Sequence, residues 1–196
     1  GNLRSVCLAF DRCGADTKIL HDPNEASNVR ALVLPGVGSF QAAMDCLVRT
    51  GWDMEINDQL SHGKKLIGIC LGMQMLFDYG TEDGPSNGLG LIPGNVVPIE
   101  SKMNLRIPHI GWNSVFWQQE HPVMRGIRTG LDFYHVHSYH CIPKNDEHIL
   151  ASTTYGEKLV TAVATDKVLG FQFHPEKSQP AGLKLLKNFV EWVDPC

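Results

Sequence analysis

A short glycine and cysteine motif constrains this 196-residue chain more than any other feature. Gly68, Cys70 and Gly72 alternate where the apolar run 66–69 gives way to a stretch with a helical pattern. A chain that turns from a buried strand directly into a helix strains the middle residue and leaves no room for side chains two positions away. The motif therefore predicts a nucleophile elbow, with Cys70 at the carboxyl end of a sheet. A buried core cysteine ahead of a helix is the structural alternative.

The first half of the sequence alternates between two patterns. Short apolar runs rich in β-branched residues predict strands, and apolar spacings of three and four residues predict helices. Such alternation predicts an α/β fold, with an open, mostly parallel, flavodoxin-like sheet and helices on both faces. The expected strands are 17–20, 31–34 and 66–69, and the expected helices are 3–10, ending near Gly14, 41–49, 54–61 and 71–79.

The second half contains mostly strand-like segments with few helices between them, which predicts antiparallel additions to the sheet. A closing amphipathic helix is expected over 182–192. The expected strands are 91–99, 114–117, 133–140, 160–163 and 168–173.

The length and composition are those of one globular domain, because 43% of the residues are hydrophobic and 19% are charged. No linker or repeat divides the chain, so residues 1–196 are expected to form a single domain. A doubly wound sheet normally begins with a strand, whereas this sequence begins directly with a predicted helix. The first strand of the fold is therefore expected to be absent before Gly1.

Charge and hydropathy exclude several classes of partner. The formal net charge is -4, and no run of Lys or Arg provides the basic surface that nucleic acid requires. No stretch approaches the roughly 20 apolar residues of a membrane span, and the start lacks a signal-peptide pattern. The six cysteines have no C-x-x-C spacing. We therefore expect a cytoplasmic protein with reduced thiols and without nucleic-acid or membrane partners.

A histidine and a carboxylate follow the last predicted strand. His174 and Glu176 flank a proline. His174 supplies a base, and the carboxylate of Glu176, two residues further on, orients that base. With Cys70 they complete a nucleophile, base and acid set, in which His174 takes the thiol proton and later returns it to the leaving group. A solvated surface turn is the alternative when the tripeptide is considered alone.

A glycine-rich loop follows the strand predicted over 31–34. Gly36 and Gly38 leave backbone N–H groups free to approach a ligand. An oxyanion hole then has one donor from Leu71, the residue after Cys70, and a second from this loop, at Gly38. A plain turn after a strand is the alternative.

A histidine-rich segment over 135–141 suggests a metal site instead. His135 and His137 are two residues apart, so on a strand both rings point to the same face. Cys141 joins them only if the strand is unbroken, and no further ligands stand at a recognisable spacing. We therefore expect neither a metal nor a cofactor.

Three segments resemble the class I glutamine amidotransferases: Pro-Gly-Val-Gly at 35–38, Gly-Ile-Cys-Leu-Gly-Met-Gln at 68–74 and Phe-His-Pro-Glu-Lys-Ser at 173–178. Within that family, Gly-Asn-Leu-Arg-Ser-Val at 1–6, Pro-His-Ile-Gly-Trp-Asn at 108–113 and Val-His-Ser-Tyr at 136–139 look most like the glutaminase subunits of imidazole glycerol phosphate synthases. Anthranilate, aminodeoxychorismate and carbamoyl-phosphate synthases are less similar in the last two segments.

The resemblance implies hydrolysis of L-glutamine through a thioester on Cys70, with ammonia channelled to a β/α-barrel cyclase subunit in histidine biosynthesis. It implies a heterodimer with that cyclase and no cofactor. Family positions that bind glutamine fall on Gly38, Gln74, Glu82, Ser138 and Tyr139, with Glu82 pairing the α-ammonium. Family positions that face the cyclase fall on Asn2, Trp112, Asn113, Tyr134 and Lys177.

Other functions remain open at this point. A paralogous subunit that feeds ammonia to a cyclase-like partner, as in sugar amidation, has the same motifs. A cysteine peptidase or deglycase on a similar fold usually places its acid outside a His-x-Glu pair. A catalytically silent binding module has no need of Cys70, His174 and Glu176 together.

Overall fold

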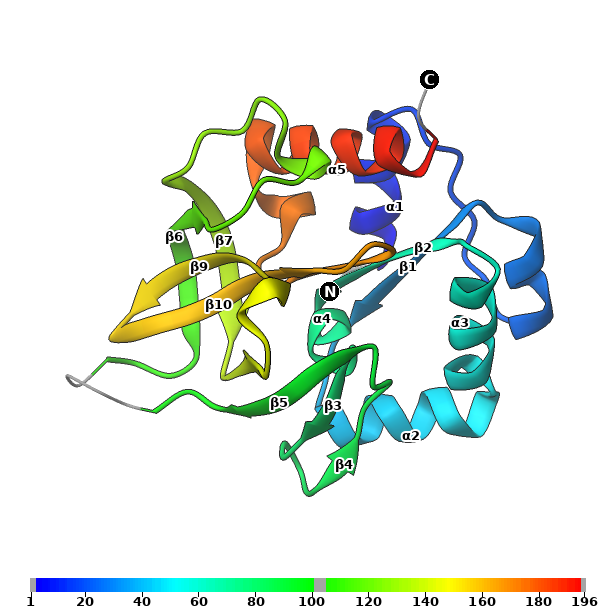
Figure 1. Cartoon of the computed structure of the whole chain (residues 1–196), viewed down its shortest axis with the longest axis horizontal. Coiled ribbons are helices and arrows are strands. Elements are labelled where there is room, and N and C mark those ends of the chain that lie inside the picture. Colours follow the sequence, from blue (N-terminus) through cyan, green and yellow to red (C-terminus); the bar gives the residue numbers. More distant parts are fainter. Residues whose placement is uncertain (1–2, 101–104, 195–196) are drawn as a thin grey trace.

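Three parallel strands form one side of the sheet in this computed structural model, which describes residues 3–100 and 105–194 (Figure 1). They are β1 (Ala31–Gly36), β2 (Lys65–Cys70) and β11 (Val168–Phe171), with β2 in the middle. Beyond β11 the sheet continues with β10, β8, β5, β3 and β4, largely by antiparallel pairing. These outer strands are β10 (Glu157–Ala164), β8 (Tyr139–Pro143), β5 (Ile92–Pro98), β3 (Phe77–Gly80) and β4 (Ser86–Asn87).

Three further strands branch from the main sheet. β6 (His109–Trp117) pairs antiparallel with β7 (Leu131–His137) along most of its length. The end of β6 pairs with β9 (Ile149–Tyr155), and β9 in turn pairs with β10. The antiparallel additions expected in the second half of the chain are therefore confirmed.

Helices cover both faces of the three parallel strands, as expected for this α/β class (Figure 1). On one face α1 (Leu3–Arg12) and α5 (Gln179–Val193) pack against Ile67 and Ile69. On the other face α2 (Phe40–Thr50), α3 (Trp52–Ser61) and the short α4 (Leu71–Met75) pack with Leu66. Successive side chains of a strand point to opposite faces, so a strand covered on both sides is apolar at nearly every position. None of the helices in the described ranges is long and apolar enough to cross a membrane.

Two predicted elements are wrong. Residues 17–20 form no strand, and Ile19 is 44% exposed, so this short apolar run lacks the neighbour that a strand requires. The helix predicted over 71–79 ends with α4, and the chain enters β3 at Phe77. The backbone N–H groups of Leu89 and Leu91 donate to the carbonyls of Met75 and Leu76, which a longer helix needs for its own turns.

The segment predicted as one strand over 133–140 is two. It breaks at Ser138, so that β7 pairs with β6 while β8 joins the main sheet. Cys141 therefore does not lie on one unbroken strand with His135 and His137. β9 was not predicted, because its Ser and Thr residues interrupt the apolar pattern of a strand that is largely buried.

The remaining short elements are 3-10 turns. They are η1 (Pro23–Asn28), η2 (Pro122–Met124), η3 (Asp146–His148) and η4 (Pro175–Lys177). The last of these follows β11 directly and carries Glu176.

Candidate active site

Cys70 ends β2 with a strained backbone, at φ 58° and ψ -112°. Residues other than glycine rarely adopt this region of backbone angles, and such strain often marks functional positions. A Cβ atom on Gly68 would lie 2.6 Å from the carbonyl oxygen of Gly72, and one on Gly72 would lie 1.7 Å from that of Leu34. Both glycines are therefore required by close packing at the turn, which has the sharp geometry that the motif predicts. α4 has only five residues, so its effect on the sulfur comes from its first-turn N–H groups rather than from a long dipole.

His174 lies at the carboxyl end of β11, the parallel neighbour of β2. Its Nδ1 is 2.8 Å from Glu176 Oε1, and both side chains are almost fully buried. The backbone N–H of His174 donates to the Tyr134 carbonyl at 2.8 Å, and Ser178 Oγ donates to the backbone carbonyl of His174 at 2.6 Å. The loop is thereby fixed against β7, with the ring and its carboxylate at the same end of the sheet as Cys70.

The charges around His174 favour its protonated form. Burial lowers its pKa, but the neighbouring Cys70 and the hydrogen bond and negative charge of Glu176 outweigh burial and raise the pKa to about 9. Because Nδ1 bonds Glu176, the other ring nitrogen, Nε2, is the one left to exchange a proton with Cys70. Nε2 is buried and has no hydrogen-bond partner among the described residues. The arrangement therefore suits a thiolate beside an imidazolium.

The glycine-rich loop lies next to the turn at Cys70. Gly36 is paired with Cys70 in the β1 and β2 register, and a Cβ atom on Gly36 would lie 2.9 Å from Leu71 Cβ. Gly38 has a φ of +94°, which a side chain would strain, and nothing lies within 4 Å of its would-be Cβ. The two segments predicted to supply oxyanion donors, at Gly38 and Leu71, are thus neighbours.

Gln74 is buried behind the cysteine and bonded to two groups. Its Nε2 donates to the Tyr139 carbonyl at 3.2 Å and to Gln172 Oε1 at 3.1 Å. Gln172 Nε2 in turn lies 4.0 Å from the sulfur of Cys70. Sequence motifs did not single out Gln172, although a glutamine between two phenylalanines of a buried strand, two residues before His174, is a detectable signal.

The break between β7 and β8 lies beside the nucleophile. Cys70 Sγ is 3.8 Å from the carbonyl of Val136, and Ser138 in the break accepts a backbone hydrogen bond from Ile99 at 2.8 Å. Ser138 and Tyr139, both predicted substrate positions, therefore belong to the segment that borders Cys70.

Glu82 is anchored at the start of α2. Its Oε2 accepts a hydrogen bond from the N–H of Phe40 at 3.0 Å. Burial raises the pKa of Glu82, the Phe40 N–H lowers it, and the charge of Asp83 raises it further. This predicted substrate position thus lies at the end of the loop that contains Gly38.

Two of the predicted partner residues, Trp112 and Lys177, lie beside the ring of Tyr134. Its ring centroid lies 6.0 Å from that of Trp112, and Lys177 Nζ lies 5.4 Å above the same ring. Trp112 is 47% exposed, as a docking residue would be. Asn113 Nδ2 donates to the carbonyl of Thr154 at 2.9 Å. Asn2 lies outside the described residues.

The histidine-rich segment does not gather metal ligands. His135 Nδ1 is 2.9 Å from the carbonyl of Phe133, and its Nε2 is 2.8 Å from Thr161 Oγ1. Across 3–100 and 105–194, no three His, Cys, Asp or Glu side chains are placed to hold a metal ion.

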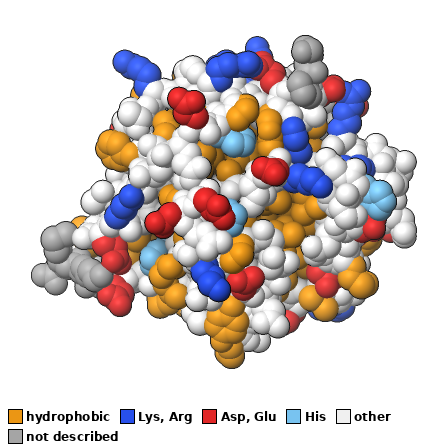
Figure 2. All heavy atoms as spheres, in the orientation of Figure 1, with side chains coloured by type: hydrophobic (Ala, Val, Ile, Leu, Met, Phe, Trp, Pro, Cys, Tyr) orange, Lys and Arg blue, Asp and Glu red, His pale blue; other side chains and the backbone are white. Residues whose placement is uncertain are grey.

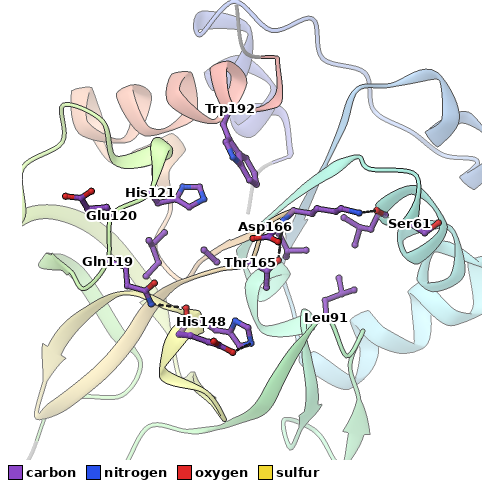
Figure 3. A pocket seen from close by; sticks show the side chains of 15 residues that line it. Ser61, Leu91, Gln119, Glu120, His121, His148, Thr165, Asp166 and Trp192 are labelled. Atoms are coloured by element: carbon purple, nitrogen blue, oxygen red, sulfur yellow. Dashed lines mark hydrogen bonds and ion pairs between the residues drawn. The ribbon is translucent and has the colours of Figure 1, made fainter.

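A cavity of about 840 Å³ lies at the start of β11 (Figure 3). Thr165, Asp166 and Lys167, which precede β11, line it together with His121 and Trp192. His174 follows the opposite end of β11, so this cavity is separate from the candidate site. Figure 2 shows acidic and basic side chains mixed over one face of the molecule, without a broad basic area there.

Comparisons with known proteins identify similar chains along the whole length. The family model for glutamine amidotransferase class-I matches residues 3–192. Imidazole glycerol phosphate synthase subunit HisH of Wolinella succinogenes is 41% identical, covering 97% of this chain and 95% of the relative. The subunit HisH of Caldanaerobacter subterraneus subsp. tengcongensis is 45% identical, covering 98% of this chain and 94% of the relative.

Solved structures share the fold at low sequence identity. A crystal structure of a glutamine amidotransferase superposes with a TM-score of 0.73 at 21% identity, covering 98% of this chain and 94% of that one. The structure of PurLQS from Thermotoga maritima gives a TM-score of 0.76 at 16% identity, covering 96% and 92%. These two similarities concern the fold alone.

Proposed function

Because the chain belongs to the class I glutamine amidotransferases, and among them to the relatives of imidazole glycerol phosphate synthase subunit HisH, we propose that it is the glutaminase subunit of such a synthase. It hydrolyses L-glutamine to glutamate and ammonia. A cyclase subunit then uses the ammonia in histidine biosynthesis, and the two subunits form a heterodimer.

The buried contact between His174 and Glu176 carries the proposed mechanism, because it lies beside the strained turn at Cys70 on the next strand. His174 takes the proton of the thiol, and the thiolate attacks the side-chain carbonyl carbon of glutamine. Backbone N–H groups of Leu71 and Gly38 stabilise the oxyanion that forms. Its collapse breaks the carbon–nitrogen bond, and ammonia leaves with the proton from His174.

The thioester left on Cys70 is then hydrolysed. His174 takes a proton from water, and the resulting hydroxide attacks the thioester carbon and releases glutamate and the thiolate. Glu176 holds Nδ1 of the ring throughout, which keeps Nε2 directed at the reacting atoms and stabilises the imidazolium.

The remaining predicted residues hold the substrate. Glu82 pairs with the α-ammonium of glutamine, a role supported by the fixed position of its carboxylate near the Gly38 loop. Gln74, Ser138 and Tyr139 border the substrate on the other side, which is supported by their place next to Cys70 and Val136.

The cyclase docks over Trp112, Asn113, Tyr134 and Lys177. The contact of Tyr134 with the backbone of His174 supports this, because a partner seated there reaches the end of β11. Ammonia is mostly protonated in neutral water and then cannot act as a nucleophile, so a closed path between the subunits preserves its reactivity. A cytoplasmic location is part of the proposal, and it is supported by the described cysteines, 7, 13, 46, 70 and 141, which are all free.

Glutamate release by the purified chain, measured with and without the cyclase subunit, tests the proposal. We expect release that requires Cys70 and increases when the cyclase is present. No glutamate release in either condition, from a chain shown to be folded, would contradict it.

A further inference from the structure

A row of polar side chains connects the half-buried Asn113 on β6, through two buried histidines, with the carbonyl of Tyr139 at the start of β8. Asn113 Nδ2 lies 3.2 Å from His109 Nε2, and His109 Nδ1 lies 3.0 Å from His137 Nε2. His137 Nδ1 then lies 2.9 Å from the Tyr139 carbonyl oxygen. The two rings are only 2% and 6% exposed, so each nitrogen depends on this row for a partner.

The backbone fixes the direction of the row from its Asn113 end. Asn113 Oδ1 accepts from the N–H of Ser114 at 2.9 Å, and Nδ2 donates to the carbonyl of Thr154 at 2.9 Å. The amide nitrogen therefore faces His109 as a donor, and His109 Nε2 must accept. The proton of a neutral His109 is then on Nδ1.

The other end gives the same direction independently. The carbonyl oxygen of Tyr139 only accepts hydrogen bonds, so His137 Nδ1 must donate and its Nε2 must accept. That acceptor faces His109 Nδ1, which must donate. Both ends agree on the Nδ1–H tautomer for both rings.

Both rings are neutral at neutral pH. Burial lowers the pKa of His109 to about 4, and burial and the neighbouring histidines lower the pKa of His137 well below its ordinary value. His109 is held between two aromatic rings, with centroids 4.7 Å from His135 and 4.1 Å from Tyr155. Because each ring has one proton and a fixed position, the hydrogen bonds of the row have only one possible direction.

The row continues towards the nucleophile. The Tyr139 carbonyl that accepts from His137 also accepts from Gln74, and Gln74 bonds Gln172. Gln172 Nε2 lies 4.0 Å from Cys70 Sγ. One carbonyl oxygen thus joins the histidine pair to the polar groups that border the sulfur.

We propose that His109 and His137 are positioning residues, which hold the Tyr139 carbonyl, and through it Gln74 and Gln172, in place beside Cys70. They do not touch the substrate. The inference depends on the proposed function only in taking Cys70 as the nucleophile. The break at Ser138 has a structural role in this arrangement, because it turns the Tyr139 carbonyl towards His137 and Gln74.

The tautomers are tested by nitrogen NMR of the histidine rings in the whole chain. Nitrogen shifts distinguish a protonated ring nitrogen from one that accepts a hydrogen bond. We expect neutral Nδ1–H forms for His109 and His137 at pH 7. An Nε2–H form at either ring would overturn the inference, whether or not the chain is a glutaminase.

The positioning role is tested at His137 with a matched pair of variants. His137→Asn keeps a donor at the place of Nδ1, whereas His137→Leu fills a similar volume without one. The measured quantity is the rate at which a diazo-ketone analogue of glutamine labels Cys70. Because Leu removes one of the two donors that hold the Tyr139 carbonyl and leaves only Gln74, we expect His137→Leu to slow labelling by about 10-fold and His137→Asn to retain most of the rate.

Two controls separate positioning from loss of structure. Iodoacetamide, which does not resemble glutamine, should label Cys70 of both variants at a rate close to that of the unchanged chain. His62→Asn changes an exposed histidine outside the cluster and should leave labelling by the analogue unchanged. Equal slowing in the Asn and Leu variants, or no slowing in His137→Leu, would overturn the inference. Failure of the analogue to label Cys70 in the unchanged chain would instead contradict the proposed function.

Discussion

His174 is the residue at which burial and charge oppose each other most directly. Burial disfavours the imidazolium, while Cys70 and Glu176 favour it strongly enough to raise the pKa to about 9. Because folding raises this pKa from 6.5, the imidazolium stabilises the folded chain below about pH 6.5, and this contribution disappears as the pH rises through about 9. The protonation of one ring therefore reports on the whole candidate triad.

Replacing Cys70 with Ala should lower the pKa of His174. The substitution removes the thiol and its negative charge from beside the ring, and it leaves burial and Glu176 in place. An NMR titration of the histidine rings measures the shift, with Cys46→Ala as a control at an exposed cysteine. An unchanged His174 pKa in Cys70→Ala would show that the thiol does not interact with the ring.

A glutamine-like electrophile should modify Cys70 and spare the other cysteines. Among the cysteines within 3–100 and 105–194, Cys70 alone combines the strained turn, a base on the neighbouring strand and partial exposure. Cys46 is exposed without such a base, so it should react with iodoacetamide and not with the analogue. Peptide mass mapping identifies the labelled residue, and label mainly on Cys7, Cys46 or Cys141 would contradict the assignment.

At the scale of elements, the tight turn between β2 and α4 is the most demanding part of the fold. A Cβ atom on Gly72 would lie 1.7 Å from the Leu34 carbonyl oxygen, so α4 packs against β1 only with glycine at that position. Gly14 has a positive φ of +87° but open space around it. A substitution at Gly72 therefore tests steric overlap, and one at Gly14 tests backbone strain without overlap.

Gly72→Ala should destabilise the chain by more than about 3 kcal/mol, because a rigid backbone atom must move to admit the methyl group. Gly14→Ala should cost only about 1 kcal/mol, the strain of a left-handed alanine. Urea unfolding of both variants gives the two free energies. Equal losses would show that the packing of α4 on β1 is looser than described.

Elements buried on both faces were the ones that the sequence predicted best. The runs 31–34 and 66–69 are apolar at successive positions, and the structure confirms them within β1 and β2. Residues 17–20 have a similar run, but pairing with a neighbour decides whether such a run is a strand. β9 shows the opposite error, since Ser152 and Thr153 are buried through hydrogen bonds and not through apolar character.

The candidate site was predictable where chemistry requires particular residue types at fixed spacing. Cys70 and His174 occur in such motifs, and their places at the ends of β2 and β11 follow from parallel pairing. Gln172 and the pair of His109 and His137 have no such motif, because their roles arise from long-range contacts between strands. Those contacts depend on the break at Ser138, which periodicity did not reveal.

At the scale of the whole molecule, glutamine turnover should depend on the partner. Nothing lies within 4 Å of a would-be Cβ atom on Gly38, and the cyclase docks near the end of β11 in the proposed complex. One misplaced oxyanion donor typically costs ~10²–10³ in rate, so adding the cyclase subunit should raise glutamine turnover by about that factor. Steady-state glutamate release measures it, with Trp112→Ala as an interface variant. Full activity in the isolated chain would contradict partner control.

The central claim is that Cys70 releases ammonia here and that the partner consumes it elsewhere. The most direct measurement compares product formation by the assembled complex of the cyclase with either the unchanged chain or Cys70→Ala. It is made first with saturating glutamine, then with high ammonium salt at raised pH. Alanine suits the tight turn at this position, so the complex should assemble, which gel filtration verifies.

We predict that Cys70→Ala abolishes synthesis from glutamine and leaves synthesis from ammonia near that of the unchanged complex, because the cyclase uses ammonia from any source. Glutamine-dependent synthesis at a comparable rate in the variant would show that Cys70 is not the nucleophile. Loss of ammonia-dependent synthesis in an assembled complex would contradict the division of the two reactions between separate sites.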